Sequence, residues 1–386
     1  MTTLLLIIIY IAFISLGLPD AILGSAWPTM YEGFHVPISY VGMISMLIAG
    51  GTIISSLFSD KLMRKLGTGK VTAISVAMTA VALMGFSFSN SFWELCFWAI
   101  PYGLGAGSVD AALNNFVAIN YKSRHMSWLH CFWGIGATAG PYIMGLCLTN
   151  NLKWNVGYKA IGILQVVLVI VLILSLPLWK IKKEGGMAES EVKSLSFKET
   201  IKLPGAKNMF IAFFAYCSLE ATAGLWASSY MVLQKGISAE TAAKWAALFY
   251  LGITVGRFIS GFITDKIGNK NMVRIGQGIA AVGILIMIMP LGNTWSLIGL
   301  MMIGLGCAPI YPSLLHETPR NFGEDKSQAI MGMQMASAYV GTTFMPPLFG
   351  VITQNLSISW YPWYLLIFVL IMLCMVEGVN ALHRKK

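Results

Sequence analysis

Twelve runs of apolar residues, each about 20 residues long, make up most of this 386-residue chain. A run of that length crosses the hydrocarbon core of a bilayer as an α-helix. The runs therefore predict an all-α membrane protein with twelve transmembrane helices. The runs are residues 4–30, 39–58, 71–89, 93–119, 128–148, 157–179, 209–234, 246–263, 272–291, 295–315, 329–353 and 360–379.

Composition excludes several other classes of protein. Charged residues make up 11% of the chain, against about 25% of a soluble domain. The net charge of +10 does not indicate nucleic-acid binding, because the basic residues lie in short gaps between apolar runs and form no single patch. The six cysteines lack metal-ligand spacing, and the sequence contains no nucleotide-binding loop or exposed Ser/His/Asp set. We therefore expect no metal, no cofactor, no nucleic-acid partner and no enzymatic activity.

The positions of the Lys and Arg residues predict the orientation of the chain. Most of the 26 lie in one set of connections, in the stretch 180–207 and at the C-terminus. By the positive-inside rule, we expect both termini and this stretch to be cytoplasmic in a multi-pass protein of the cytoplasmic (inner) membrane. The first run starts at Leu4 without a basic segment or a cleavage site, so we expect a retained span and not a signal peptide.

Three sequence patterns occur twice and divide the chain into two halves. GFITDKIGNK at 261–270 matches SLFSDKLMRK at 56–65, which pairs Asp265 with Asp60. GATAGPYIMG at 136–145 matches GTTFMPPLFG at 341–350, and GLG at 103–105 matches GLG at 304–306. Such repeats in a membrane protein are typical of transporters. They predict two pseudo-symmetric six-helix bundles, residues 1–179 and 208–386, joined by a cytoplasmic linker at 180–207.

The loop pattern G-x-x-x-D-[RK]-x-G-x-[RK] is complete in the second copy, whereas Ser56 and Met63 replace its glycines in the first. Together with the twelve runs, it resembles the major facilitator superfamily over essentially the whole chain. Strings such as LGLPDAILGSAWP at 16–28 and GLGAGSVDAALNNFVA at 103–118 resemble its fucose/glucose:proton symporter branch. The resemblance implies a secondary transporter with alternating access, in which this loop clamps the cytoplasmic side of the outward-facing state. The clamp residues that the motif implies are Asp60, Lys61, Gly261, Asp265 and Lys266.

Acidic residues inside apolar runs indicate a function without reference to any family. Asp20, Asp110 and Glu220 are of this kind. A charge at the bilayer centre costs on the order of 3 kcal/mol, so such residues normally face a cavity. We expect Asp110, and after it Asp20, to carry protons, and Glu220 to bind the hydroxyls of a solute. His130 lies at a similar depth in the next helix and is expected to share or relay the proton of Asp110. Packing carboxylates, and a histidine bonded to a nearby carbonyl, are the alternatives.

Sugar binding needs polar groups for the hydroxyls and aromatic faces for the apolar side of the ring. The candidates are Asn114, Asn115, Gln165, Gln277 and Gln334 for the hydroxyls, and Trp133, Trp226, Tyr230 and Tyr311 for the ring. Ordinary packing is the alternative for each aromatic residue. Arg257 lies inside a span, and we expect it to form part of the clamp with a partner such as Asp265 or Glu317. Extension of its side chain to the membrane interface is the alternative.

The function predicted from these residues is proton-coupled symport of a monosaccharide or a similar small hydroxylated solute, with sodium as the alternative ion. A proton-driven efflux antiporter for drugs or metabolites is the second hypothesis, because Gly136–Pro141–Gly145 resembles an antiporter motif. A lipid-handling protein or a transport-dead sensor is the third. We expect a monomer in the lipid bilayer.

Overall fold

The computed structural model describes residues 2–20, 22–37, 40–150, 152–179, 195–237 and 239–384. Helices account for nearly all of these residues, and no strand occurs among them, which confirms the all-α prediction. Of the predicted linker at 180–207, residues 180–194 lie outside the described part of the chain. The rest of the linker holds the short helix α8 (Phe197–Lys202), which begins with a capping box between Ser196 and Glu199.

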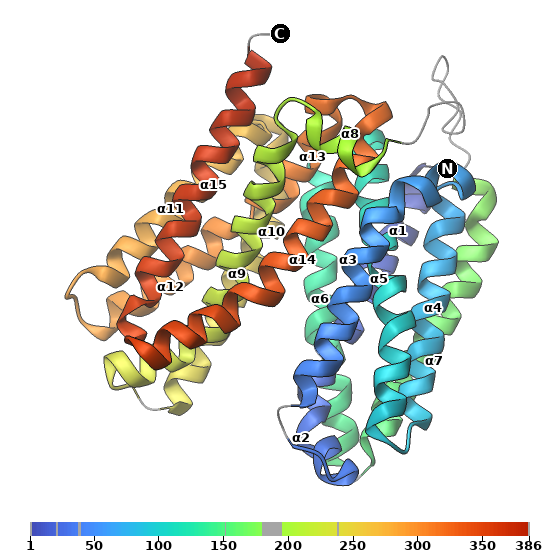
Figure 1. Cartoon of the computed structure of the whole chain (residues 1–386), viewed down its shortest axis with the longest axis horizontal. Coiled ribbons are helices and arrows are strands. Elements are labelled where there is room, and N and C mark those ends of the chain that lie inside the picture. The colour runs from blue at the N-terminus through green and yellow to red at the C-terminus, as the bar shows by residue number, and fades with distance from the viewer. Residues whose placement is uncertain are drawn as a thin grey trace. The chain divides into compact units, whose positions relative to one another are not determined.

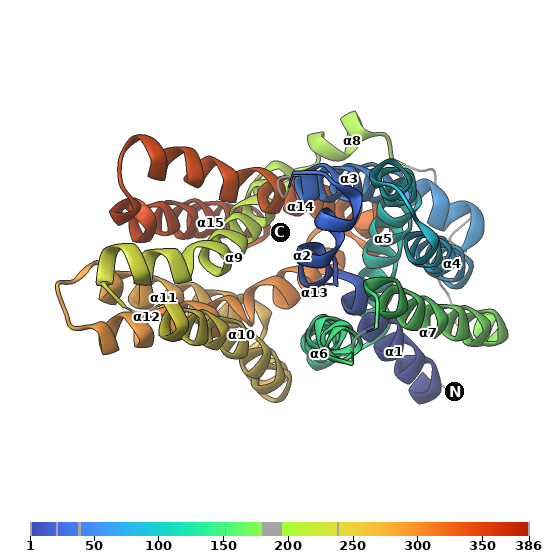
Figure 2. The same cartoon turned by 90° about the horizontal axis from the view of Figure 1, so that it is seen from below.

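Long helices joined by short turns form the chain (Figures 1 and 2). The helices before the linker are α1 (Thr2–Asp20), α2 (Ile22–Phe34), α3 (Val41–Leu66), α4 (Thr68–Phe88), α5 (Phe92–Asn120), α6 (Ser123–Thr149) and α7 (Trp154–Ser175), followed by the 3-10 helix η2 (Leu176–Trp179). After the linker come α9 (Ala206–Lys235), α10 (Ala239–Ile267), α11 (Asn269–Ile288), α12 (Asn293–Cys307), α13 (Ile310–Phe322), α14 (Glu324–Asn355), η3 (Ile358–Trp360) and α15 (Tyr361–Arg384).

Ten helical segments of the described chain are long and apolar enough to cross a membrane. The helices α5 and α10, each of 29 residues, occupy the fourth and eighth predicted runs. The first predicted run contains α1 and α2, and residue 21 between them lies outside the described part of the chain. The tenth run is divided between α12 and α13 at Ala308 and Pro309, because a proline lacks the amide hydrogen that would continue the helix.

The helices form two compact units. Unit 1 comprises Met1–Phe116 and Leu129–Leu195, and unit 2 comprises Val117–Trp128 and Ser196–Lys386. The end of α5 and the start of α6 therefore belong to unit 2, whereas the remainder of both helices belongs to unit 1. In unit 1, α4 packs along α7; in unit 2, α9 packs against α14 and α15, and α11 packs against α12.

Glycine contacts show that the two units repeat the same helix packing. A Cβ atom on Gly103 would lie 2.2 Å from the carbonyl oxygen of Ile48 in unit 1. On Gly304 it would lie 2.3 Å from the carbonyl oxygen of Phe249 in unit 2. Both residues of the second contact lie 201 positions after their counterparts in the first, which confirms the pairing of the two GLG sequences.

The loop motifs follow the same offset, and this corrects the predicted pairing of Asp265 with Asp60. Gly67 separates α3 from α4 with a φ of 78°, and Gly268 separates α10 from α11 with a φ of 85°. Only glycine adopts this backbone conformation readily, so the two positions are equivalent. With Gly67 matched to Gly268, the counterpart of Asp265 is Arg64. The predicted pairing of the two loop motifs was therefore displaced by four residues, about one helical turn.

The first helix of each unit also repeats. A Cβ atom added to Gly136 of α6 would lie 2.0 Å from the carbonyl oxygen of Ile14 in α1. A Cβ atom added to Gly341 of α14 would lie 2.5 Å from the carbonyl oxygen of Phe214 in α9. This confirms the predicted pairing of Gly136 with Gly341. It also makes positions 20 and 220, each six residues beyond the contacted carbonyl, equivalent in α1 and α9.

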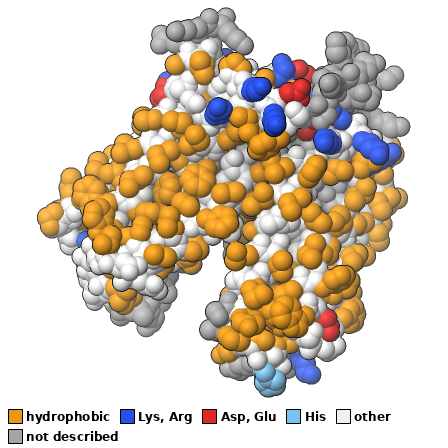
Figure 3. Space-filling model, in the orientation of Figure 1, with side chains coloured by type: hydrophobic (Ala, Val, Ile, Leu, Met, Phe, Trp, Pro, Cys, Tyr) orange, Lys and Arg blue, Asp and Glu red, His pale blue; other side chains and the backbone are white. Residues whose placement is uncertain are grey.

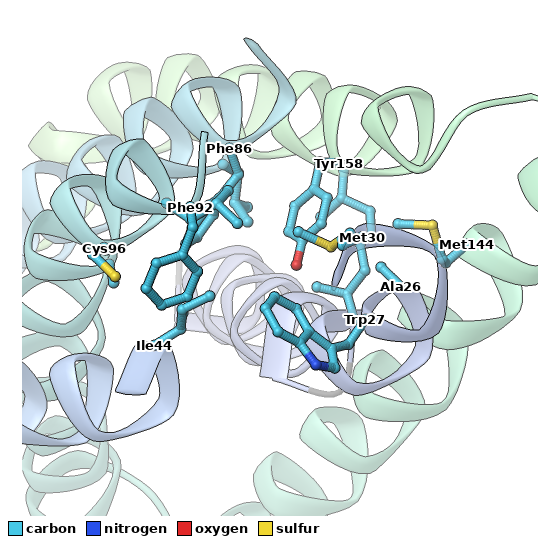
Figure 4. Packing of buried hydrophobic residues seen from close by; sticks show 14 of the residues in the cluster. Ala26, Trp27, Met30, Ile44, Phe86, Phe92, Cys96, Met144 and Tyr158 are labelled. Carbon is cyan, nitrogen blue, oxygen red and sulfur yellow. The ribbon is translucent and has the colours of Figure 1, made fainter. Parts of the chain in front are cut away.

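Large side chains bury one another where the helices of unit 1 meet. Trp27 and Met30 of α2 lie close to Phe86 of α4, Phe92 of α5 and Tyr158 of α7 (Figure 4). Full burial of a large apolar side chain contributes about 1.5–3 kcal/mol relative to its exposure. The cluster therefore fixes α2 against three other helices.

The surface shown in Figure 3 is that of a multi-pass membrane protein. Hydrophobic side chains cover the middle of the helices in each unit, and most of the Lys and Arg side chains visible in this view lie near the helix ends. Large apolar residues such as Leu174 and Leu225 are more than 60% exposed. Such exposure is unfavourable in water and suits contact with lipid chains.

Candidate functional site

The Asp20 carboxylate, at the end of α1, accepts hydrogen bonds from two other helices. The indole Nε1 of Trp133 in α6 donates to Asp20 Oδ2 at 2.8 Å. The hydroxyl of Tyr102 in α5 donates to Asp20 Oδ1 at 3.1 Å. Asp20 is exposed, and both of these donors are neutral, so the carboxylate can bind a proton or a solute hydroxyl without breaking an ion pair with either.

Small residues in α1 and α6 bring these groups together. A Cβ atom on Gly17 would lie 2.1 Å from the carbonyl oxygen of Trp133 and 2.7 Å from the amide of Ala137. The glycine therefore allows the two backbones to touch one turn before Asp20. The sequence predicted Asp20 and Trp133 as site residues but missed Tyr102. An aromatic residue in a span gives no signal that separates a hydrogen-bond donor from a packing side chain.

A chain of hydrogen bonds connects Asp110 with His130 through Asn114. Asn114 Nδ2 donates to Asp110 Oδ1 at 2.8 Å, and Asn114 Oδ1 lies 3.1 Å from His130 Nε2. Because an amide oxygen only accepts, this contact requires a proton on His130 Nε2. Asn114 and His130 are buried. The predicted neighbours Asp110 and His130 are thus brought together, and Asn114, predicted to bind the solute, is bonded to both.

Glu220 of α9 occupies in unit 2 the position of Asp20 in unit 1, but it lies beside a cation. Arg257 of α10 has a guanidinium nitrogen 3.3 Å from Glu220 Oε1 and 3.5 Å from the hydroxyl oxygen of Tyr216. Arg257 is 5% exposed, and the side chain of Glu220 is 22% exposed. Tyr311 completes the group, with its ring centroid 5.5 Å from that of Tyr216.

This arrangement corrects the predicted partner of Arg257. The sequence predicted Asp265 or Glu317, whereas the structure pairs Arg257 with Glu220. Residues eight positions apart on a helix differ in direction by about 80°, so Arg257 and Asp265 do not project from the same line of α10. Arg257 therefore belongs with the acidic residue of unit 2 and not with the clamp motif.

Four other predicted solute-binding residues lie in packing positions. The Tyr230 hydroxyl donates to a backbone carbonyl of α11 at 3.4 Å, and the Trp226 indole donates to a backbone carbonyl of α14 at 2.9 Å. Gln334 is fully buried, with its amide nitrogen 2.9 Å from the hydroxyl of Thr318. Asn115 is also buried. Since none of them presents an exposed polar group, we leave them out of the proposed site.

Asp265 of the clamp motif binds both a cation and a helix N-terminus. Its Oδ2 lies 2.5 Å from Arg124 Nε, and its Oδ1 accepts from the backbone amide of Arg124 at 3.2 Å. Arg124 is the second residue of α6, where amides are free to donate, and the helix dipole favours a negative charge there. Gly261, one turn earlier, packs on the indole of Trp128. Lys266 is exposed.

The first copy of the motif makes a local ion pair. Asp60 is buried and accepts from Arg64 Nε at 3.0 Å, one turn further along α3. Lys61 is exposed, with its ammonium 5.5 Å from the ring centroid of Phe58. Because Arg64 is the counterpart of Asp265, the two motifs place opposite charges at equivalent positions.

The fold, the repeats and the loop motif together define a secondary transporter. The chain matches the sequence profile of the Major Facilitator Superfamily over residues 9–243 and 208–382, and it belongs to that superfamily. It is therefore a membrane transporter for small molecules and not an enzyme.

Individual relatives are distant. The chain is 23% identical to the glucose/mannose transporter GlcP of Bacillus subtilis over 323 residues, which cover 79% of this chain and 77% of GlcP. Its fold is similar to that of the E. coli fucose:proton symporter FucP, with a TM-score of 0.76, 16% identity and 98% of each chain covered. It is also similar to the human organic anion transporter MFSD10, with a TM-score of 0.78, 13% identity and 97% and 98% of the two chains covered.

Proposed function

We propose that the protein is a proton-coupled symporter of a monosaccharide or a similar small hydroxylated solute. The observation that carries the proposal is the exposed Asp20 carboxylate between Trp133 and Tyr102. A carboxylate accepts strong hydrogen bonds from solute hydroxyls, and aromatic faces suit the apolar side of a sugar ring. The relatives that transport glucose, mannose or fucose support this solute class.

Asp110 is the principal proton carrier in this proposal, with Asp20 as the second candidate. Asp110 is bonded to the neutral Asn114 and, through it, to His130, which offers a route for the proton. Glu220 binds the solute in unit 2, together with Tyr311. An ionised acceptor such as Glu220 makes hydrogen bonds about twice as strong as a neutral one.

The proposed transporter has a fixed orientation in the membrane and a clamp on its cytoplasmic side. Both termini and the linker at 180–207 lie in the cytoplasm, as the positive-inside rule favours. The bond between Asp265 and Arg124 then stabilises one conformational state of the carrier from the cytoplasmic side. The transporter is built from an N-terminal half, residues 1–179, and a C-terminal half, residues 208–386, each with six spans.

Arg257 favours one other candidate function, the transport of an organic anion. A buried guanidinium can exchange the carboxylate of Glu220 for that of a solute, once Glu220 takes up a proton. The likeness to the organic anion transporter MFSD10 is compatible with this exchange. An anion would have to bind in unit 2, where Arg257 lies.

Transport by the purified protein in liposomes tests the proposal. An imposed inward proton gradient should drive accumulation of one of glucose, mannose or fucose, and Asp110→Asn should abolish accumulation while sparing downhill exchange. Asp325→Asn, which alters an exposed acid of α14 that lies 3.5 Å from the ammonium of its neighbour Lys326, is the matched control. Accumulation that survives in Asp110→Asn with unchanged pH dependence would contradict the coupling assignment.

Other outcomes select the other functions. Accumulation of a carboxylate solute that Arg257→Gln abolishes would favour organic anion transport. Solute export against its gradient, driven by proton entry, would favour the efflux antiporter. If no solute moves although sugars bind, the protein acts as a sensor.

A further inference from the structure

An apolar groove of about 620 Å³ lies on the surface of unit 1, between α4, α5 and α7. Its sides include Val81 and Phe88 of α4, Phe97 of α5 and Val166 of α7, all of which are exposed. Val81 and Phe88 are seven residues apart on one face of α4, so the groove extends for about 10 Å along the helix. That volume falls in the range of ligand sites, about 300–1,000 Å³.

The floor of the groove is formed by an unusually close helix contact. A Cβ atom on Gly85 would lie 2.1 Å from the indole ring of Trp98, so the ring packs directly on the backbone of α4. The neighbouring ring of Phe97 stands nearly perpendicular to that indole, with their centroids 5.1 Å apart. Gly85 therefore makes room for the Trp98 indole, which forms the floor of the groove next to the ring of Phe97.

A carboxylate is fixed at one end of the groove. Glu94, in the first turn of α5, lines the groove and is exposed. Its Oε2 accepts from the backbone amide of Asn90 at 2.9 Å, and its Oε1 accepts from the hydroxyl of Ser91 at 3.1 Å. Each carboxylate oxygen has a second lone pair, so Glu94 can accept a further donor without losing these bonds.

A cation lies at the same end. Lys159 of α7 has its ammonium 5.8 Å from the ring centroid of Phe88, another lining residue. Lys159 and Val166 are seven residues apart and so share a face of α7. Asn155, at the start of α7, donates to the backbone carbonyl of Ser87 at 3.0 Å, which fixes this end of α7 against the end of α4.

We propose that this groove binds a membrane phospholipid with a primary ammonium headgroup, a phosphatidylethanolamine. One acyl chain lies along the apolar groove, the phosphate pairs with Lys159, and the headgroup ammonium donates to Glu94. The groove offers one cation and one anion at its polar end, as a zwitterionic headgroup requires. A choline headgroup has no N–H to donate to Glu94, and a lipid with net negative charge would be repelled by it.

Competition between lipids on the full-length protein tests the assignment. The protein is delipidated in detergent, and retention of phosphatidylethanolamine and phosphatidylcholine with matched acyl chains is measured by native mass spectrometry. We expect about a three- to fivefold preference for phosphatidylethanolamine, about what one net hydrogen bond contributes, because choline keeps the positive charge but has no N–H to donate. Glu94→Gln should remove this preference, and Lys159→Gln should weaken the binding of both lipids.

A second pair of variants tests the position of the acyl chain. Val81→Trp fills the groove and should reduce retention of both lipids. Leu164→Trp is the matched control, because Leu164 is about equally exposed but lies two residues from Val166, on a different face of α7. Equal retention of the two lipids by the unaltered protein, or a preference that persists in Glu94→Gln, would overturn the headgroup assignment. Unchanged retention in Val81→Trp would overturn the groove itself.

Discussion

The contact between Gly17 and α6 predicts that Gly17→Ala damages the site at Asp20. The added Cβ atom would lie 2.1 Å from the carbonyl oxygen of Trp133, whereas ordinary van der Waals contact begins at 3.4 Å. Both neighbouring atoms belong to the α6 backbone, so no side-chain rotation relieves the clash. The two helices must therefore separate by about 1 Å near Gly17.

This displacement is large enough to break a specific hydrogen bond. Asp20 lies one turn beyond Gly17, and its Oδ2 is 2.8 Å from Trp133 Nε1. A further 1 Å would bring the separation to about 3.8 Å, beyond the range of a hydrogen bond. The variant should lose about 1–3 kcal/mol of stability from overpacking, partly offset by the higher helix propensity of alanine. Solute affinity should fall at least about tenfold, because the displaced Asp20 carboxylate no longer presents its oxygen to the solute, and a hydrogen bond to a charged group contributes about 1.5–3 kcal/mol.

Thermal unfolding in detergent and equilibrium binding of the transported solute measure both effects. Gly145→Ala is the matched control in α6, because a Cβ atom there has no neighbour within 4 Å. Trp133→Phe keeps the ring but removes the N–H, and it should lower affinity with little change in the unfolding temperature. Indistinguishable behaviour of Gly17→Ala and Gly145→Ala in both assays would refute the reasoning.

Four further outcomes are expected from the structure. Asp265→Asn should reduce transport more than solute affinity, because it weakens the bond to Arg124 that biases the conformational equilibrium; equal transport by variant and parent would contradict a clamp. Glu220→Gln should weaken solute binding without abolishing the response to pH, as measured by binding at two pH values. Gln277 is buried with neither amide atom bonded in the described chain, so Gln277→Met should raise the unfolding temperature; a decrease would indicate a partner for the amide. A cysteine introduced at Ser190, outside the described residues, should react with impermeant reagents only after the cells are opened, and labelling of intact cells would reverse the proposed orientation.

Hydrophobicity alone was sufficient to predict the spans, because insertion into lipid depends on the average transfer free energy of a stretch of about 20 residues. The break at Pro309 falls inside such a stretch and leaves its average unchanged, so it was not predicted. The register of the loop motifs was also misjudged. Asp60-Lys61 and Arg64-Lys65 repeat a charged pair after one turn, and only the positive φ of Gly67 shows which turn matches Gly268.

Pairing between helices was the least predictable part of the site. Asp110 and His130 could be placed near each other because a short turn joins their helices, and Asn114 shares a face with Asp110. Arg257 and Glu220 lie on α10 and α9, and their contact depends on how far each helix is rotated about its axis. That rotation is set by the packing of many small residues, which a single sequence does not reveal.

The equivalence of Asp20 and Glu220 has an electrical consequence. The charge of Glu220 is balanced by Arg257 within the same unit, so the pair is neutral as it moves. The donors to Asp20 in the described chain, Trp133 and Tyr102, carry no charge. Moving one unbalanced elementary charge across a membrane potential of 100 mV changes its energy by about 2.3 kcal/mol. The membrane voltage therefore changes the energy of the ionised Asp20, and not that of the Glu220–Arg257 pair, when the carrier without solute changes conformation.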